Sequence, residues 1–134
     1  LGMPRYVTRK VQDALNEQRK SLNGSKILVL GVAYKPDIDD LRESPALDVI
    51  GLLEQSGAEV SFHDPYIPSI KEEEFELQSV PDLMSAVKAA DCVVIITNHS
   101  DYVYAEILET AKCIVDTRNA LGSAARGNPK VFRL

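Results

Sequence analysis

Continuous runs of apolar residues alternate along this chain with segments in which apolar residues recur every three or four positions. The continuous runs predict strands that are buried on both faces, and the three-and-four spacing predicts amphipathic helices. The predicted order is strand 27–30, helix 46–55, strand 59–63, helix 81–89, strand 92–97, helix 102–111, strand 113–116 and an edge strand at 131–134. Strands that alternate with helices indicate an α/β fold, here a Rossmann-like doubly wound parallel sheet.

A polar segment at residues 65–79 interrupts this alternation. It contains the acidic run Lys71-Glu72-Glu73-Glu74 and carries neither the helical spacing nor a continuous apolar run. Charge runs of this kind are usually solvated. We therefore expect the segment to be a loop and assign no function to its acidic residues.

A further helix is predicted at residues 4–20, with Asn23-Gly24 as its stop signal. Its apolar stripe, which includes Val7, Val11 and Leu15, has little earlier sequence to pack against, and the chain opens with leucine rather than methionine. Two interpretations stay open. Either residues 1–24 are the end of a helix that connects to another part of a longer protein, or they form a helix that caps the domain at residues 25–134.

Composition and charge narrow the function classes. The chain has 134 residues, of which 45% are hydrophobic and 26% charged, and no segment approaches the ~20 apolar residues of a membrane span. A net charge of −5 provides no basic field for nucleic acid. We expect a cytoplasmic protein with neither membrane nor nucleic acid as partner. Cys92 and Cys113 lie in apolar runs, so both are expected to be buried, unreactive thiols.

The stretch from Lys26 to Pro45 has the pattern of an anion site. An apolar strand ends at Gly31, and the cations Lys35 and Arg42 follow before the next helix. Ser44 is expected to be the N-cap of that helix and Pro45 to stand in its first turn. Because the N-terminus of a helix favours negative charge, this arrangement predicts a phosphate site.

The glycine fingerprint of a dinucleotide site, G-x-G-x-x-G, is absent, because Val32, Ala33 and Tyr34 follow Gly31. A standard grip on NAD by this domain is therefore not expected. Cations must replace backbone amides at the phosphate: Lys35 as a point charge, and Arg42 and Arg118 with forked contacts. On spacing alone, a solvated loop lysine describes Lys35 equally well.

The other polar residues near strand ends favour structural roles. Asp37, Asp39 and Asp40 are expected to make turns or to pair with Arg42 or Lys35, and no metal site is expected. Asp64 precedes a proline and is interpreted as a structural turn residue. His63 and His99 have no triad partner in sequence, so no catalytic residue is assigned.

Three motifs together resemble a known family. The runs GVAYKPDIDDLRESP (31–45), GAEVSFHDPY (57–66) and VDTRN (115–119) are similar to the C-terminal, UDP-binding domain of the UDP-glucose/GDP-mannose dehydrogenase family, and MPRYV with ALN resembles the end of its central helix. Such enzymes of polysaccharide biosynthesis oxidise the C6 hydroxyl of a nucleotide sugar to a carboxylate with two molecules of NAD. The resemblance implies a fragment, inactive alone, that would partner an N-terminal NAD-binding domain in a homodimer or higher homo-oligomer.

The resemblance also implies residue roles. Tyr34 and Lys35 match contacts to the UDP-sugar, with Lys35 on the pyrophosphate side, and Arg118 matches an arginine at the same site. Arg42 matches an arginine that reaches NAD on the other domain, which replaces internal pairing as its expected role. Neither cysteine matches the family's catalytic thiol. The motifs look most similar to members acting on UDP-N-acetylglucosamine, with UDP-glucose and UDP-N-acetylmannosamine open.

A rival hypothesis from another class is a non-catalytic oligomerisation module with a vestigial nucleotide loop. Its support in the sequence is the apolar stripe of the first helix, taken as exposed, beside a net acidic surface.

Overall fold

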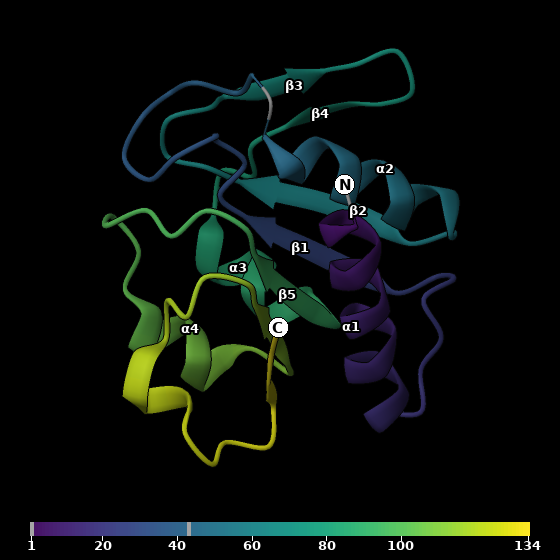
Figure 1. Ribbon diagram of the computed structural model, residues 1–134, viewed down its shortest axis with the longest axis vertical. Helices are drawn as coiled ribbons and strands as arrows, with labels where there is room; N and C mark the ends of the chain where they lie inside the picture. Colours follow the sequence, from purple (N-terminus) through teal and green to yellow (C-terminus); the bar gives the residue numbers. More distant parts are fainter. Residues whose placement is uncertain (1, 43) are drawn as a thin grey trace.

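The computed structural model describes residues 2–42 and 44–134, and in this part of the chain five strands form a parallel sheet (Figure 1). Its spatial order is β2 (Glu59–His63), β1 (Lys26–Leu30), β5 (Cys92–Ile95), β6 (Ile114–Asp116) and β7 (Val131–Arg133). Because β1 lies between β2 and β5, the chain winds outward from β1 in both directions. The Rossmann-like doubly wound fold is confirmed.

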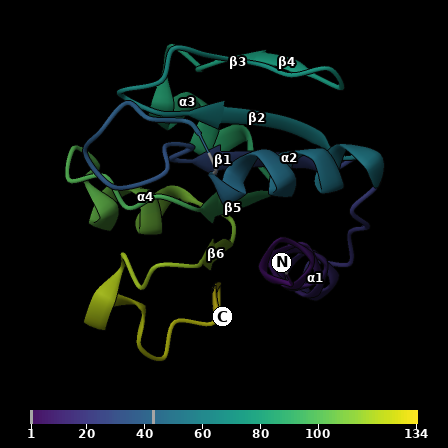
Figure 2. The same cartoon turned by 45° about the horizontal axis from the view of Figure 1, so that its top comes forward.

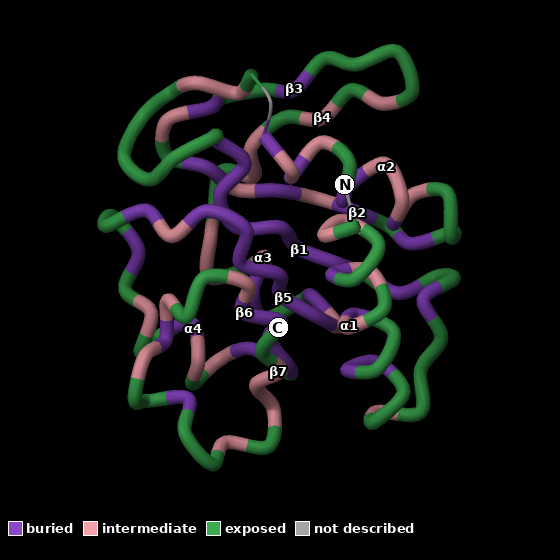
Figure 3. Tube along the Cα trace, in the orientation of Figure 1, coloured by how far each residue is buried: buried purple, intermediate pink, exposed green. Residues whose placement is uncertain are grey.

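Helices cover both faces of the sheet, as continuous apolar strands require. Alternate residues of β1 point to opposite sides, so Ile27 and Val29 pack with α1 (Met3–Glu17) and α2 (Pro45–Gln55), whereas Leu28 and Leu30 pack with α3 (Leu83–Ala89) and α4 (Tyr104–Thr110). The central strands β1, β5 and β6 are therefore almost entirely buried, whereas the edge strands β2 and β7 are partly exposed (Figure 3).

The start of α2 follows the predicted capping chemistry. The Ser44 hydroxyl accepts a hydrogen bond from the backbone N–H of Ala46 at 3.2 Å, and Pro45 occupies the first helical position. Proline is suited to that position because its missing N–H would have no partner there. The helix ends at Gln55, as expected, and is anchored by buried Val49, Ile50 and Leu53.

The first helix is shorter than predicted and lies on the sheet. It ends at Glu17 rather than at residue 20, and Arg19 adopts a left-handed backbone with φ of 59°. Val7, Val11 and Leu15 are fully buried against α2 and the strands β5, β6 and β7, so the assumption of an exposed apolar stripe was wrong. Figure 2 shows α1 end-on beside the sheet.

The segment at 65–79 is not a plain loop. It contains a short antiparallel hairpin of β3 (Ser69–Lys71) and β4 (Glu76–Gln78), and the acidic residues 72–74 form its turn. The hairpin extends the structure beyond β2, where a bridge joins Phe62 to Ser79 (Figure 2). Ile70, the middle residue of β3, is fully buried in the core, which fixes the hairpin against the domain.

Several other elements are shorter than the sequence predicted. The helices α3 and α4 begin at Leu83 and Tyr104, β5 ends at Ile95, and β6 begins at Ile114. A 3₁₀ turn at Gly122–Ala125, which the sequence pattern did not reveal, leads toward β7. Within the described residues, no helix combines the length and the apolar character needed to cross a bilayer.

Both cysteines are buried, as predicted: Cys92 begins β5, and Cys113 directly precedes the neighbouring strand β6. The Cys113 sulfur accepts a hydrogen bond from Gln18 Nε2 at 3.1 Å. The neighbouring Cys113 thiol and burial raise the pKa of Cys92. Cys92 is therefore held as a neutral thiol at the amino end of its strand.

Replacement of Leu15 by alanine tests whether α1 belongs to the core. Since the Leu15 side chain is fully buried, Leu15→Ala should lower the free energy of unfolding by about 2–5 kcal/mol. Gln12→Ala, at an exposed position of the same helix, should change it by less than about 0.5 kcal/mol. Urea unfolding followed by circular dichroism measures both, and equal small effects would show that α1 does not stabilise the domain.

Candidate functional site

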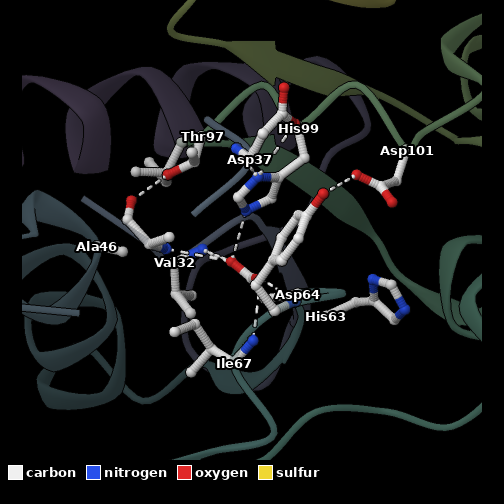
Figure 4. A network of polar contacts seen from close by, with 12 residues as sticks. Val32, Asp37, Ala46, His63, Asp64, Ile67, Thr97, His99 and Asp101 are labelled. Carbon is white, nitrogen blue, oxygen red and sulfur yellow. Dashed lines mark hydrogen bonds and ion pairs between the residues drawn. The ribbon is translucent and has the colours of Figure 1, made fainter. Parts of the chain in front are cut away.

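A buried carboxylate organises the carboxyl ends of β1 and β2. Asp64 follows β2, and its side chain is fully buried. Its Oδ2 accepts hydrogen bonds from the backbone N–H groups of Val32 at 2.7 Å and Ala33 at 3.1 Å, and its Oδ1 accepts from Tyr66 and Ile67 (Figure 4). The structural interpretation of Asp64 is confirmed, and its role is to shape the turn after Gly31.

The turn at Gly31 also depends on a close approach of two strands. Gly31 has φ of 79°, and a Cβ atom there would overlap the carbonyl oxygen of Thr97. The Thr97 hydroxyl donates to the carbonyl oxygen of Ala33 at 2.6 Å, which joins the loop after β1 to the end of β5. Glycine is therefore required at this position both for its backbone conformation and for lack of space.

His99 connects the same carboxylate to the tip of the loop. Its Nε2 donates to Asp64 Oδ2 at 2.8 Å, and its Nδ1 accepts from the backbone N–H of Asp37 at 2.8 Å. Because a backbone N–H can only donate, these contacts define a neutral ring with its proton on Nε2. His99 is fully buried, and the Tyr66 ring lies 4.9 Å from it.

Asp37 fastens the loop a second time. Its carboxylate accepts from the backbone N–H of Ser100 at 2.7 Å and from the Ser100 hydroxyl at 2.6 Å. These bonds to Ser100 lower the pKa of Asp37, so the carboxylate is charged near neutral pH. At the base of the loop, the Tyr34 N–H donates to the carbonyl oxygen of Asp40 at 2.6 Å.

The loop presents Tyr34 and Lys35 to solvent. Tyr34 is 39% exposed, and the Lys35 ammonium lies 5.6 Å from the centre of its ring. Such a pair places a cation beside an aromatic face, which can stack on a base or sugar while the ammonium contacts a phosphate. Both residues follow β1 at the carboxyl edge, the side toward which the strand arrows point in Figure 1.

Arg42 pairs with a neighbour in the same loop. Its Nε and Nη2 donate to the two carboxylate oxygens of Asp40, each at 3.1 Å, and its side chain is 88% exposed. The hydrogen bonds raise the pKa of Arg42 and lower that of Asp40. An exposed ion pair of this kind contributes little stability, so the guanidinium can exchange its partner readily.

Arg118 lies at the end of β6. Its Nε donates to the carbonyl oxygen of Ile96 at 3.0 Å, which aims the side chain toward the end of β5. Asp116, itself buried, accepts from the backbone N–H groups of Arg118, Ala120 and Leu121 and thereby forms the turn. Arg118 and Arg133 line a surface groove of about 440 Å³.

The structure thus brings Tyr34, Lys35, Arg42 and Arg118 to one edge of the sheet, in the loops after β1 and β6. Tyr34 and Lys35 are in contact, whereas the loop after β5 stands between them and Arg118. The importance of His99 could not be predicted from the sequence, because its partners lie 35 and 62 positions away. Its place just after a strand at this edge was the available signal.

A larger groove of about 720 Å³ lies between α1, α2 and the hairpin. Its lining includes Arg5, Asp48, Glu73 and Phe75, but none of the four residues at the carboxyl edge. Ligands of open α/β sheets bind outside the carboxyl ends of the strands. The carboxyl edge, rather than this groove, is therefore the candidate site.

His63 also lies beside the site but serves packing. The Tyr102 hydroxyl donates to the His63 carbonyl oxygen at 2.8 Å and lies 2.9 Å from His63 Nδ1. Because the hydroxyl has one proton, Nδ1 must be the donor in the second contact. Burial lowers the pKa of His63, which keeps this ring neutral.

Comparison with known proteins identifies the fold's relatives. Residues 28–123 match the UDP-glucose/GDP-mannose dehydrogenase family, UDP binding domain. The chain belongs to this family. The match covers more than half of the chain and includes the loops that carry Tyr34, Lys35, Arg42 and Arg118.

Individual relatives agree with this assignment. The chain is 33% identical over 127 residues to UDP-N-acetyl-D-mannosamine dehydrogenase of Methanococcus vannielii. This alignment covers 89% of this chain and 28% of the relative. It is 39% identical over 82 residues to UDP-glucose 6-dehydrogenase of Rhizobium meliloti, covering 60% and 19%. The structure of UDP-D-ManNAc dehydrogenase from Pyrococcus horikoshii superposes with a TM-score of 0.80 at 28% identity, covering 98% and 30%. The chain thus spans less than a third of these relatives.

Substitution of Gly31 tests the close approach at the site. Gly31→Ala should lower the free energy of unfolding by about 2–5 kcal/mol, because it adds backbone strain and an overlap with Thr97. Gly24→Ala is the matched control: φ there is 84°, but nothing lies within 4 Å, so about 1–2 kcal/mol is expected. Thermal and urea unfolding measure the difference, and equal losses would contradict the close approach.

Proposed function

We propose that this chain is the C-terminal, UDP-sugar-binding part of an NAD-dependent UDP-sugar 6-dehydrogenase. In this proposal Tyr34, Lys35 and Arg118 hold the nucleotide of the substrate at the carboxyl edge. The complete enzyme oxidises the C6 hydroxyl of the sugar to a carboxylate. The assignment to the UDP-binding domain of the family supports the proposal, together with the placement of these residues at one edge of the sheet.

One observation supports the proposal that side-chain cations, rather than backbone amides, contact the phosphate. The N–H groups of Val32 and Ala33, which follow the first strand, donate to Asp64 inside the protein. In a dinucleotide fold, the corresponding turn and helix N-terminus receive the pyrophosphate. Here a carboxylate has taken that position, so the negative charge of a nucleotide must be met by exposed cations, and Lys35 is placed to do so.

The same observation argues against NAD binding by this chain alone. NAD belongs, in our proposal, mainly to an N-terminal domain of the same protein, with Arg42 reaching toward it. Arg42 is exposed, and its pairing with Asp40 is weak enough to exchange. The catalytic thiol also belongs to that other part, since Cys92 and Cys113 are buried.

The sugar is a narrower proposal. The relatives reported above are named for N-acetyl-D-mannosamine and for glucose. UDP-N-acetylglucosamine, favoured by the sequence motifs, remains within the same chemical class of UDP-linked hexoses. We propose that class as substrate, with a cytoplasmic location and a homodimer or higher homo-oligomer as the working form.

The rival oligomerisation module loses its support. That hypothesis relied on an exposed apolar stripe at Val7, Val11 and Leu15, and these residues are fully buried within the domain.

Titration with UDP tests the nucleotide site in this chain. Amide NMR shifts on UDP addition should cluster at residues 31–35 and near Arg118, whereas NAD should produce none at the Gly31 turn. Lys35→Ala should weaken UDP binding by about ten-fold or more, or about 1.4 kcal/mol, because the phosphate loses its nearest cation.

Lys88→Ala is the matched control, because Lys88 is an exposed lysine at the end of α3. It should leave UDP affinity unchanged within about two-fold. Shifts with NAD alone at the Gly31 turn, or equal effects of the two lysine variants, would overturn the assignment of the site.

Arg42 is tested in a longer protein that includes the NAD-binding domain. Arg42→Ala should raise the KM for NAD by about five-fold or more while the KM for UDP-sugar stays within about two-fold, because only the interdomain contact is lost. Steady-state kinetics with each substrate varied in turn separates the two constants. A rise confined to the KM for UDP-sugar would assign Arg42 to the nucleotide-sugar site instead.

A further inference from the structure

The loop that carries Tyr34 and Lys35 is exposed yet fastened at its tip. Residues 34–39 are all exposed, and an exposed loop without tethers samples many conformations. Two attachments join its tip to the segment after β5: the Asp37 N–H to His99 Nδ1, and the Asp37 carboxylate to Ser100. The contacts are short, at 2.6–2.8 Å, and they come from a single residue of the loop.

The backbone at Asp37 is itself unusual. Its φ is 64°, in the left-handed region that costs an ordinary residue roughly 1–2 kcal/mol and that aspartate and asparagine tolerate better than most. This conformation turns the N–H of Asp37 toward His99 (Figure 4). The Asp37 side chain meanwhile reaches Ser100. The chain thus adopts a less favourable conformation at the one residue that makes both attachments.

His99 extends the attachment into the core. Its other nitrogen donates to Asp64, whose carboxylate also holds the N–H groups of Val32 and Ala33 at the start of the loop. The carbonyl oxygen of His99 accepts a hydrogen bond from the Tyr104 hydroxyl at 2.8 Å, which fixes the backbone of His99. One buried pair therefore holds the loop at both its root and its tip.

We propose that Asp37 and His99 are positioning residues for the nucleotide: they hold Tyr34 and Lys35 in the geometry that receives UDP, without touching it. The inference rests on the proposed function, since it concerns the same site. A loop ordered before binding loses less conformational entropy on binding, so release of its tip should weaken UDP affinity while the fold survives.

Asp37→Gly is the decisive variant. Glycine adopts the left-handed backbone freely and removes both contacts to Ser100. Because position 37 is exposed, the melting temperature should change little. UDP affinity, measured by calorimetry on the full chain, should fall by about five-fold or more. Heteronuclear NOE values for residues 34–39 should fall as well.

Asp37→Asn is the conservative rescue. Its amide oxygen can accept from the Ser100 N–H and its nitrogen can donate to the Ser100 hydroxyl, and asparagine tolerates the same backbone. UDP affinity should stay within about two-fold of wild type. Asp82→Gly is the matched control outside the loop, because Asp82 is likewise an exposed aspartate that accepts from a backbone N–H, that of Ser85 at 3.1 Å. It should leave UDP affinity unchanged.

Two substitutions of His99 test the hydrogen bonds of its two ring nitrogens one at a time. Glutamine can place its amide nitrogen near the position of Nε2 and keep the bond to Asp64, but it offers the Asp37 N–H no acceptor. Asparagine can place its oxygen near Nδ1 and keep the Asp37 bond, but it leaves Asp64 short of a donor. His99→Gln should therefore loosen the loop and weaken UDP binding, whereas His99→Asn should mainly lower the melting temperature.

The outcomes distinguish the two proposals. If wild type binds UDP and Asp37→Gly binds it equally well, the positioning role is wrong and the proposed function stands. If wild type shows no UDP binding at all, the proposed function of this chain fails, and the positioning role fails with it. Weaker binding by Asp37→Gly and His99→Gln, with Asp37→Asn and Asp82→Gly near wild type, supports the inference.

Discussion

Moving a carboxylate from water into a protein interior costs several kcal/mol of free energy unless hydrogen bonds replace the water that it loses. At Asp64 the replacement comes from backbone N–H groups on two loops and from Nε2 of His99. Because each donor must aim at one small group, the carboxylate fixes the path of the chain after β1 and after β2 at the same time. The geometry of the candidate site follows from this constraint, since Tyr34 and Lys35 continue directly from the amides that Asp64 holds.

The same device appears again at β6. Asp116 is buried, and it accepts from the backbone N–H groups of Arg118, Ala120 and Leu121. At both ends of the site an internal anion therefore uses the amides that a phosphate would otherwise contact. The backbone shapes the loops, and in the proposed function the side chains of Lys35 and Arg118 supply the positive charge for the nucleotide. This division would allow a Rossmann-like fold without the glycine fingerprint to bind a nucleotide.

Much of the fold could be predicted because its signals are local. The apolar run of β1, and the Ser44-Pro45 start of α2, each depend on residues a few positions apart. The hairpin of β3 and β4 was missed because its strands have three residues each and are mostly exposed, so they carry no apolar run. The burial of the α1 stripe was missed for another reason: its partners on α2, β5, β6 and β7 follow much later in the chain.

The candidate site divides in the same way. Lys35, Arg42 and Arg118 could be proposed from the sequence because cations that follow strand ends have a readable pattern, and their part in binding stays a prediction. Asp64 was correctly given a structural role. The sequence could not show which contacts between distant residues hold the loop of Lys35 in place. His99 looks unremarkable between Asn98 and Ser100, and its importance arises only when folding brings Asp37 and Asp64 to its two nitrogens. Since that contact joins the loop that carries Lys35 to the carboxylate that shapes it, the order of an exposed loop comes to depend on a buried ring. In our proposal, nucleotide affinity then depends on a residue that does not touch the nucleotide.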